Sequence, residues 1–144
     1  MTDGDYSNQN IDKEYMKIYL CGPIAGCTDE ECKDWRGAAK VRFSDSVDPM
    51  RRDYRGREKE NVQKIVELDK LDIDACECLL VNHPKPSVGS AMEILYAWER
   101  KKIIVIVCPK DVVQSPWLVY HSNVIVDTFD EAYEIIEDII IRDL

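Results

Sequence analysis

Residues 78–107 of this 144-residue chain read CLLVNHPKPSVGSAMEILYAWERKKIIVIV. The stretch contains an apolar run at 78–83, a turn rich in Pro and Gly at 84–89, a helical pattern at 90–98 and a second apolar run at 103–107. Continuous apolar strands separated by helices are typical of a parallel sheet that is covered on both faces. The stretch therefore predicts one strand–helix–strand unit of an α/β sheet.

The same alternation continues toward the N-terminus. The apolar run 16–21 predicts a first strand, and Thr28 to Glu31 form a capping box that begins a helix running toward Phe43. A short extended piece at 46–49 and a helix from about 57 to 75 follow.

Toward the C-terminus, a loop containing Ser115, Pro116 and Trp117 leads to a last strand at 123–126. A terminal helix follows, and its buried face is predicted to carry Ala132, Ile135, Ile136, Ile139 and Ile140. The whole pattern predicts a single-domain, doubly wound (flavodoxin- or Rossmann-like) α/β fold with a five-stranded parallel sheet and helices on both faces. Right-handed crossovers would bring the turns at 22–27, 49–57 and 84–90 to one edge of this sheet.

Composition limits the possible partners. A hydrophobic content of 45% over 144 residues suits one domain, predicted at 15–144 after a polar leader at 1–14. The net charge of −9 argues against nucleic acid or an anionic membrane as the main partner and favours a small-molecule ligand. The chain has neither a long apolar stretch nor a signal-peptide pattern, so we expect a cytoplasmic protein.

The six cysteines form no Cys-x-x-Cys pair and are predicted to be reduced thiols. Cys76 and Cys78 with His83 do not match a closed zinc site in ligand number or spacing, so no metal is predicted. Walker-type and Gly-x-Gly-x-x-Gly loops are also missing after the predicted strands, which leaves triphosphate hydrolysis and dinucleotide redox chemistry without support.

Glu93 is the first candidate for chemistry. It lies just inside a helix that begins directly after a buried strand, where ligands bind in open α/β sheets. An ionised carboxylate held there suits a nucleophile that attacks a sugar carbon. The alternative is a first-turn Glu that only complements the helix dipole.

Asp69 is the second candidate. It continues an apolar helical stripe formed by Val62, Ile65 and Val66, where another apolar side chain is expected. A carboxylate at such a position is either functional or paired, for example with Lys64, Lys70 or an Arg of the 51–57 stretch. That stretch holds four arginines, and it is either a solvated loop or part of a pocket or subunit contact.

Three sequence blocks together resemble the nucleoside 2-deoxyribosyltransferase family. They are Lys17 to Ile24 (KIYLCGPI), Asp48 to Gly56 (DPMRRDYRG) and Ser87 to Glu93 (SVGSAME), with Asp69 between the last two. The resemblance covers nearly everything from Met16 to the last helix. It implies transfer of 2-deoxyribose between nucleobases through a covalent sugar ester of Glu93, with slow hydrolysis as a side reaction and without a cofactor.

The resemblance also implies roles for other residues. Asp69 would protonate the leaving base, and Tyr19 would orient Glu93 by a hydrogen bond. Asp53 would read the base, and an acid there favours adenine or cytosine. Asn123 would reach the sugar site of a neighbouring subunit, which requires a homo-oligomer; the alternative is an Asn that only starts a strand. The remaining substrate contacts are predicted at Gly22, Pro23, Ser87, Gly89 and Met92.

Two further functions stay open. Related deoxynucleoside 5′-monophosphate N-hydrolases carry a phosphate-binding Ser where this chain has Ser87. Those hydrolases also tend to have a Ser in the first turn, where this chain has Pro23, which offers neither a hydroxyl nor a backbone N–H. The transferase is therefore favoured over the monophosphate hydrolase. A non-catalytic nucleotide sensor on the same fold is the third possibility, although two retained acids argue against it.

Overall fold

The computed structural model describes residues 16–142, so the predicted leader at 1–14 lies outside the described residues. Five parallel strands form one sheet in the order β2-β1-β3-β4-β5, which confirms the predicted sheet. The strands are β1 (Ile18–Cys21), β2 (Ser46–Val47), β3 (Cys78–Asn82), β4 (Ile103–Val107) and β5 (Val124–Val126). The chain reverses its direction of winding between β1 and β3, and ligands bind at such a point in open α/β sheets.

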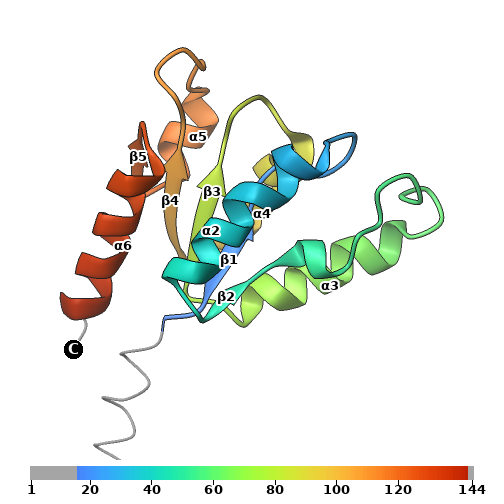
Figure 1. The fold of residues 1–144 in the computed structure, drawn as a ribbon, viewed down its shortest axis with the longest axis horizontal. Helices are drawn as coiled ribbons and strands as arrows, with labels where there is room; N and C mark the ends of the chain where they lie inside the picture. Colours follow the sequence, from blue (N-terminus) through green and yellow to red (C-terminus); the bar gives the residue numbers. More distant parts are fainter. Residues whose placement is uncertain (1–15, 143–144) are drawn as a thin grey trace, which may run out of the picture.

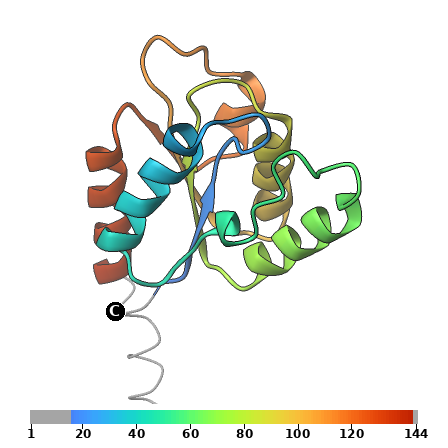
Figure 2. The same ribbon diagram turned by 45° about the vertical axis from the view of Figure 1, so that its right-hand side comes forward.

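Helices cover both faces of the sheet (Figure 1). Helices α2 (Trp35–Arg42) and α6 (Phe129–Arg142) lie on one face, and α3 (Val62–Asp74), α4 (Val88–Glu99) and α5 (Pro116–Tyr120) lie on the other. Figure 2 separates the cyan and red helices α2 and α6 from the green and olive helices α3 and α4. No helix within residues 16–142 is both long enough and apolar enough to cross a bilayer.

Side chains of β1 alternate between these two layers, as the period of two requires. Ile18 and Leu20 belong to the core beneath α2 and α6, whereas Tyr19 and Cys21 belong to the core beneath α3 and α4. All four are fully buried. The alternation therefore aims both Tyr19 and Cys21 at the helix that carries Glu93.

Two helical segments differ from the prediction. The helix expected between Thr28 and Phe43 begins with a π-helical turn, η1 (Glu30–Asp34), before α2. Its capping box is confirmed, because Thr28 and Glu31 exchange backbone-to-side-chain hydrogen bonds of 2.9 and 3.2 Å. The loop expected around Pro116 contains the short helix α5, whose first turn is capped by the Ser115 hydroxyl at 3.2 Å from the Trp117 amide nitrogen.

Helix α3 begins at Val62 and not near residue 57. Gly56 has a φ of +81°, a left-handed conformation that a helix does not accept. Residues 52–61 form an irregular loop after a short 3-10 turn, η2 (Pro49–Arg51). Val62 and Val66 of the apolar stripe are 61% and 46% exposed. The stripe therefore does not enter the core; Ile65 and Val66 form part of a cavity wall.

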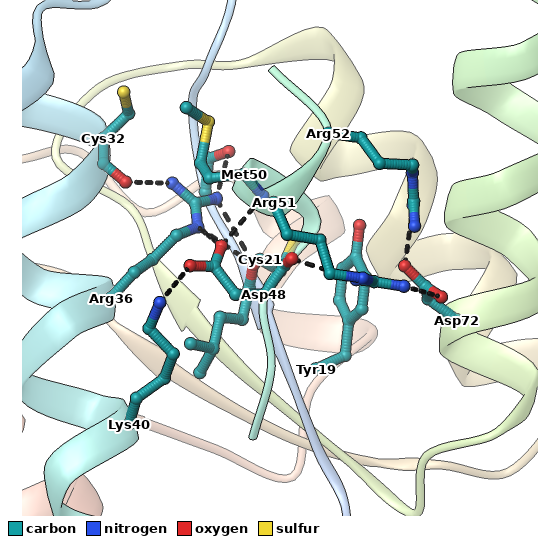
Figure 3. A network of polar contacts seen from close by, with 12 residues as sticks. Tyr19, Cys21, Cys32, Arg36, Lys40, Asp48, Met50, Arg51, Arg52 and Asp72 are labelled. Atoms are coloured by element: carbon teal, nitrogen blue, oxygen red, sulfur yellow. Dashed lines mark hydrogen bonds and ion pairs between the residues drawn. The ribbon is translucent and has the colours of Figure 1, made fainter. Parts of the chain in front are cut away.

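Arg36 on α2 is buried without exposed side-chain surface and ties several segments together (Figure 3). Its guanidinium donates hydrogen bonds to the carbonyl oxygens of Cys32, Leu20 and Gly22 at 2.7 to 3.3 Å. Its Nε also lies 3.6 Å from Asp48, which binds Lys40 at 2.8 Å. One side chain thus joins the end of β1, the π-helical turn and the approach to η2.

We expect Arg36→Met to lower the free energy of unfolding by about 3 to 5 kcal/mol, because it removes the hydrogen bonds to three carbonyl groups and one of the two cations at Asp48. Denaturant titration of both proteins measures the loss. Arg42→Met is the matched control on the same helix, since Arg42 pairs with Glu137 at the surface and is 45% exposed. Equal losses in the two variants would contradict the role assigned to Arg36.

Candidate active site

A cavity of about 550 Å³ opens between α3 and α4 at the carboxyl edge of the sheet. All three turns that were predicted to meet there contribute to its wall. The contributing residues are Gly22, Ile24 and Ala25 from the first turn, Pro49, Arg52, Tyr54 and Arg55 from the second, and Ser87, Val88 and Gly89 from the third. Helix α3 adds Ile65, Val66 and Asp69, and helix α4 adds Met92 and Glu93. The wall is mainly apolar and also carries charged residues of both signs, among them the Asp69 and Glu93 carboxyl groups and Arg52 and Arg55.

Glu93 is held from the sheet by two donors. The Tyr19 hydroxyl donates to Oε2 at 2.6 Å, and the Cys21 thiol lies 3.4 Å from Oε1. Burial, the main cause, together with the Glu93 charge raises the pKa of both donors above their ordinary values, so both stay protonated and can donate. A thiol is the weaker donor, and Oε1 is therefore the oxygen more free to react.

Asp69 lies beside Glu93 and is paired on its other side with an arginine. Its Oδ1 accepts a hydrogen bond from Arg52 at 3.2 Å, and the same Arg52 nitrogen binds Asp72 at 2.7 Å. Arg51 holds the second oxygen of Asp72 at 2.8 Å. Asp69 therefore forms the ion pair that the sequence allowed and also lies on the cavity wall, where a functional acid was expected.

Burial and mutual repulsion favour one proton between the two neighbouring carboxyl groups. Burial raises the pKa of Glu93 to about 8, and the negative charge of Asp69 adds to this rise. Burial also raises the pKa of Asp69, but hydrogen bonds from Glu93 and Arg52 oppose the rise. Of the two carboxyl groups, Glu93 therefore binds a proton more strongly, and Asp69 is the group that accepts its hydrogen bond.

The raised pKa predicts how stability depends on pH. The contribution of Glu93 is complete below its ordinary pKa of about 4.3 and is lost as pH rises toward its folded value of about 8. Glu93→Gln keeps a neutral side chain at every pH and should gain stability over the wild type across this interval. Denaturant titrations from about pH 5 to about pH 9 measure the difference. The exposed Glu99→Gln on the same helix is the control, and a pH-independent difference for Glu93→Gln would contradict the assignment.

Several predicted substrate contacts do lie on the cavity wall: Gly22, Ser87, Gly89 and Met92. Ser87 is the N-cap of α4, where its hydroxyl accepts from the Ser90 amide at 3.3 Å and bonds the Ser90 hydroxyl at 3.0 Å. Gly22 is required by close packing, since a Cβ there would lie 2.9 Å from the Trp35 ring. The wall thus contains two paired hydroxyls at the start of a helix.

Three other predicted contacts lie away from the cavity wall. Pro23 is buried. Arg55 contacts both oxygens of Asp53 at 3.0 and 2.8 Å and lowers its pKa to about 2, so Asp53 is an ionised carboxylate paired with Arg55. Arg55, not Asp53, lines the cavity. The Asn123 amide oxygen accepts from the Ile104 N–H at 2.7 Å, as expected of an Asn that starts a strand, and its role at a neighbouring subunit stays a prediction.

Two residues of the site, Cys21 and Arg52, and the buried Arg36 were not singled out from the sequence. Cys21 follows Tyr19 by two positions, and the strand period could have placed both on Glu93. Arg52 was included only in a group of possible partners for Asp69. For Arg36 the sequence offers no signal, because its neighbours Trp35 and Ala39 indicate an ordinary apolar helix face.

Comparison with known proteins gives a likeness in structure but none in sequence. No protein-family profile and no curated protein matches the sequence. The structure is similar to that of a CMP N-glycosidase, BcmB, from Clostridium botulinum, with a TM-score of 0.55 and 17% identity over 84% of this chain and 98% of that one. At this identity the likeness confirms the fold, a five-stranded parallel α/β sheet in a single domain, and membership of the deoxyribosyltransferase family stays a prediction.

Proposed function

We propose that this protein cleaves the N-glycosidic bond of 2′-deoxynucleosides through a covalent sugar ester of Glu93 and transfers the sugar to a second base. The observation that carries the proposal is the contact of Glu93 with Tyr19 and Asp69 in one apolar-walled cavity. The fold shared with a CMP N-glycosidase supports cleavage of this kind of bond. The sequence resemblance supports a base as the acceptor.

A single proton transfer between the two carboxyl groups prepares both the nucleophile and the acid for the first step. When the proton moves from Glu93 to Asp69, Glu93 becomes a carboxylate nucleophile and Asp69 becomes an acid. Oε1 of Glu93 then forms a bond to the sugar C1′ as the C1′–N bond breaks, and the Asp69 proton goes to the departing base nitrogen. Tyr19 stays on Oε2 and fixes the carboxylate in place.

The second step reverses the first. An acceptor base attacks C1′ with a ring nitrogen, the bond from C1′ to Glu93 breaks, and the proton released by the base returns to Asp69. Two displacements at C1′ retain the configuration of the sugar. Apolar side chains of the wall, Ile65, Val66 and Met92, offer a surface on which either base can lie.

A second candidate function is hydrolysis of deoxynucleoside 5′-monophosphates. The paired hydroxyls of Ser87 and Ser90 at the N-terminus of α4 favour it, because a phosphate gains hydrogen bonds and dipole stabilisation at such a place. The fold likeness to an enzyme that acts on CMP points the same way. In this reaction water replaces the acceptor base.

Chromatography distinguishes the two reactions. Purified protein is incubated with a panel of 2′-deoxynucleosides, each with a different free base, and separately with the matching 5′-monophosphates without an acceptor. New deoxynucleosides are the expected product and support sugar transfer. Free base released chiefly from the monophosphates would replace the transferase with the nucleotide hydrolase and assign Ser87 to phosphate.

Mass spectrometry tests the covalent step independently. A deoxynucleoside with fluorine at C2′ slows breakdown of a sugar ester, so the protein should gain the mass of the fluorinated sugar on the peptide that contains Glu93. If ligands bind but neither an adduct nor base release occurs with any compound, the enzyme proposal fails. The non-catalytic sensor would then be the better interpretation.

A further inference from the structure

We propose that Arg52 is a positioning residue that keeps the shared proton on Glu93 while the cavity is empty and lets it pass to Asp69 when a base contacts the guanidinium. The catalytic consequence rests on the proposed function, whereas the placement of the proton does not. Arg52 thereby prevents the empty site from holding an ionised nucleophile. Nothing in the resemblance assigns this role to the Arg51–Arg57 stretch.

The geometry of Arg52 suits a residue that is divided between two acids. Its Nη2 lies 2.7 Å from Asp72 and 3.2 Å from Asp69, so the contact with Asp72 is the shorter one. Its side chain is only 19% exposed, and the residue lines the cavity. Arg51 and Arg52 meet at the Asp72 carboxylate in Figure 3. A small movement of Arg52 toward Asp72 would therefore release Asp69 without leaving the guanidinium unpaired.

The arrangement of charges around Asp69 and Glu93 makes Arg52 the residue that determines which of them binds the proton. Charged or titratable groups surround Asp69. Among them are Arg52 on the loop after η2, Asp72 on the same helix as Asp69, and Glu93 on α4. Glu93 faces the neutral donors Tyr19 and Cys21 from β1, and the charge of Arg36 acts from α2. Among residues 16–142, Arg52 is the only cation within ion-pair distance of Asp69. Its contact with Asp69 therefore decides which carboxyl group binds the proton more strongly.

A ligand changes this balance by contacting Arg52. A base that accepts a hydrogen bond from the guanidinium draws it away from the longer contact, and Asp69 loses its nearest positive charge. The O–H bond of Glu93 then breaks and an O–H bond forms on Asp69, with no other atom exchanged. The site becomes competent for the first displacement only when a base is present.

Carbon-13 NMR of the glutamate side-chain carboxyl groups tests the proposal directly, because this carbon reports whether Glu93 is protonated. The Glu93 resonance is assigned by its loss in Glu93→Gln. In the ligand-free protein at neutral pH, Arg52→Gln should move this resonance toward the carboxylate position. Asp72→Asn removes the competing acid, so Arg52 stays on Asp69 and the resonance should keep the protonated position up to a higher pH than in the wild type.

Two additions make the test specific. Arg51→Gln is the matched control, since Arg51 contacts Asp72 but not Asp69, and its effect should be smaller than that of Arg52→Gln. Saturation of the wild type with free adenine should shift the Glu93 resonance in the same direction as Arg52→Gln does. The same addition should leave Arg52→Gln itself nearly unchanged. If Arg52→Gln does not fold, Arg52→Lys should show an intermediate shift, because it keeps the charge but loses the fork of donors.

The outcomes separate this inference from the proposed function. A Glu93 resonance that stays in place in folded Arg52→Gln overturns the role of Arg52, even if the wild type transfers sugar efficiently. If the NMR shifts appear as expected and the wild type releases no base from any nucleoside or nucleotide, the proposed function fails and the positioning role stands.

Discussion

Glu93→Ala should lower kcat for sugar transfer by at least about 10⁴-fold, which is the scale of loss when a covalent nucleophile is removed. Glu93 is the only carboxyl group that Tyr19 and Cys21 hold from the sheet, so within residues 16–142 no other acid is placed to replace it. Steady-state rates from chromatography measure the loss. The fluorinated sugar adduct should disappear in the same variant.

Rescue by azide shows whether Glu93 acts as the nucleophile or as a general base. A small anion can enter the space left by the Glu93 side chain and attack C1′ in a single displacement, so Glu93→Ala should regain activity and form a sugar azide of inverted configuration. Glu99→Ala, which removes a carboxylate from the far end of the same cavity wall, should keep its rate. Sugar transfer with retention by Glu93→Ala would contradict the covalent mechanism.

Asp69→Asn should lower kcat by about 10² to 10⁴-fold for ordinary nucleosides, because the departing base loses its proton donor. The loss should depend on the leaving group. A deoxyriboside of p-nitrophenol, whose anion leaves without protonation, should be cleaved at a rate close to that of the wild type. Rates for the two substrate kinds in both proteins give the comparison.

A general disturbance of the fold would affect both kinds of substrate equally. Asp74→Asn is the control for Asp69→Asn, since Asp74 ends the same helix and binds Tyr96 at 2.9 Å outside the reacting pair. It should change neither rate by more than a small factor. Equal losses of Asp69→Asn on both substrates would remove Asp69 from the role of proton donor.

The fold and the central pair of acids could be predicted because they depend on regular periods. The apolar runs at 78–82 and 103–107 are strands, and the strand-to-helix junction placed Glu93 at the carboxyl edge. The break in an apolar stripe identified Asp69, although the stripe itself forms a cavity wall and not a core. Local patterns were sufficient here because each residue's position follows from its own element.

Contacts between separate irregular segments could not be predicted in the same way. The pair of Asp53 with Arg55 and that of Arg55 with Asp29 depend on how the 49–61 loop folds against the first turn, and no period describes that loop. The choice of Arg52 over the lysines for Asp69 has the same origin. These contacts place Arg55, and not Asp53, on the cavity wall. Sequence patterns cannot predict this, because it depends on how the loop folds.

The buried Arg36 determines which part of the cavity an engineer could exchange. The wall at 22–25 is tied by Arg36 from within the fold, through the Leu20 and Gly22 carbonyl oxygens. The wall at 52–58 depends on partly exposed pairs such as Arg55 with Asp29. Libraries for new base preferences should therefore vary Tyr54, Arg55 and Glu58 of the second wall and leave Arg52 and the first wall unchanged. The 22–25 segment thus belongs to the fixed scaffold, whereas part of the 52–58 segment can be exchanged without disturbing the core.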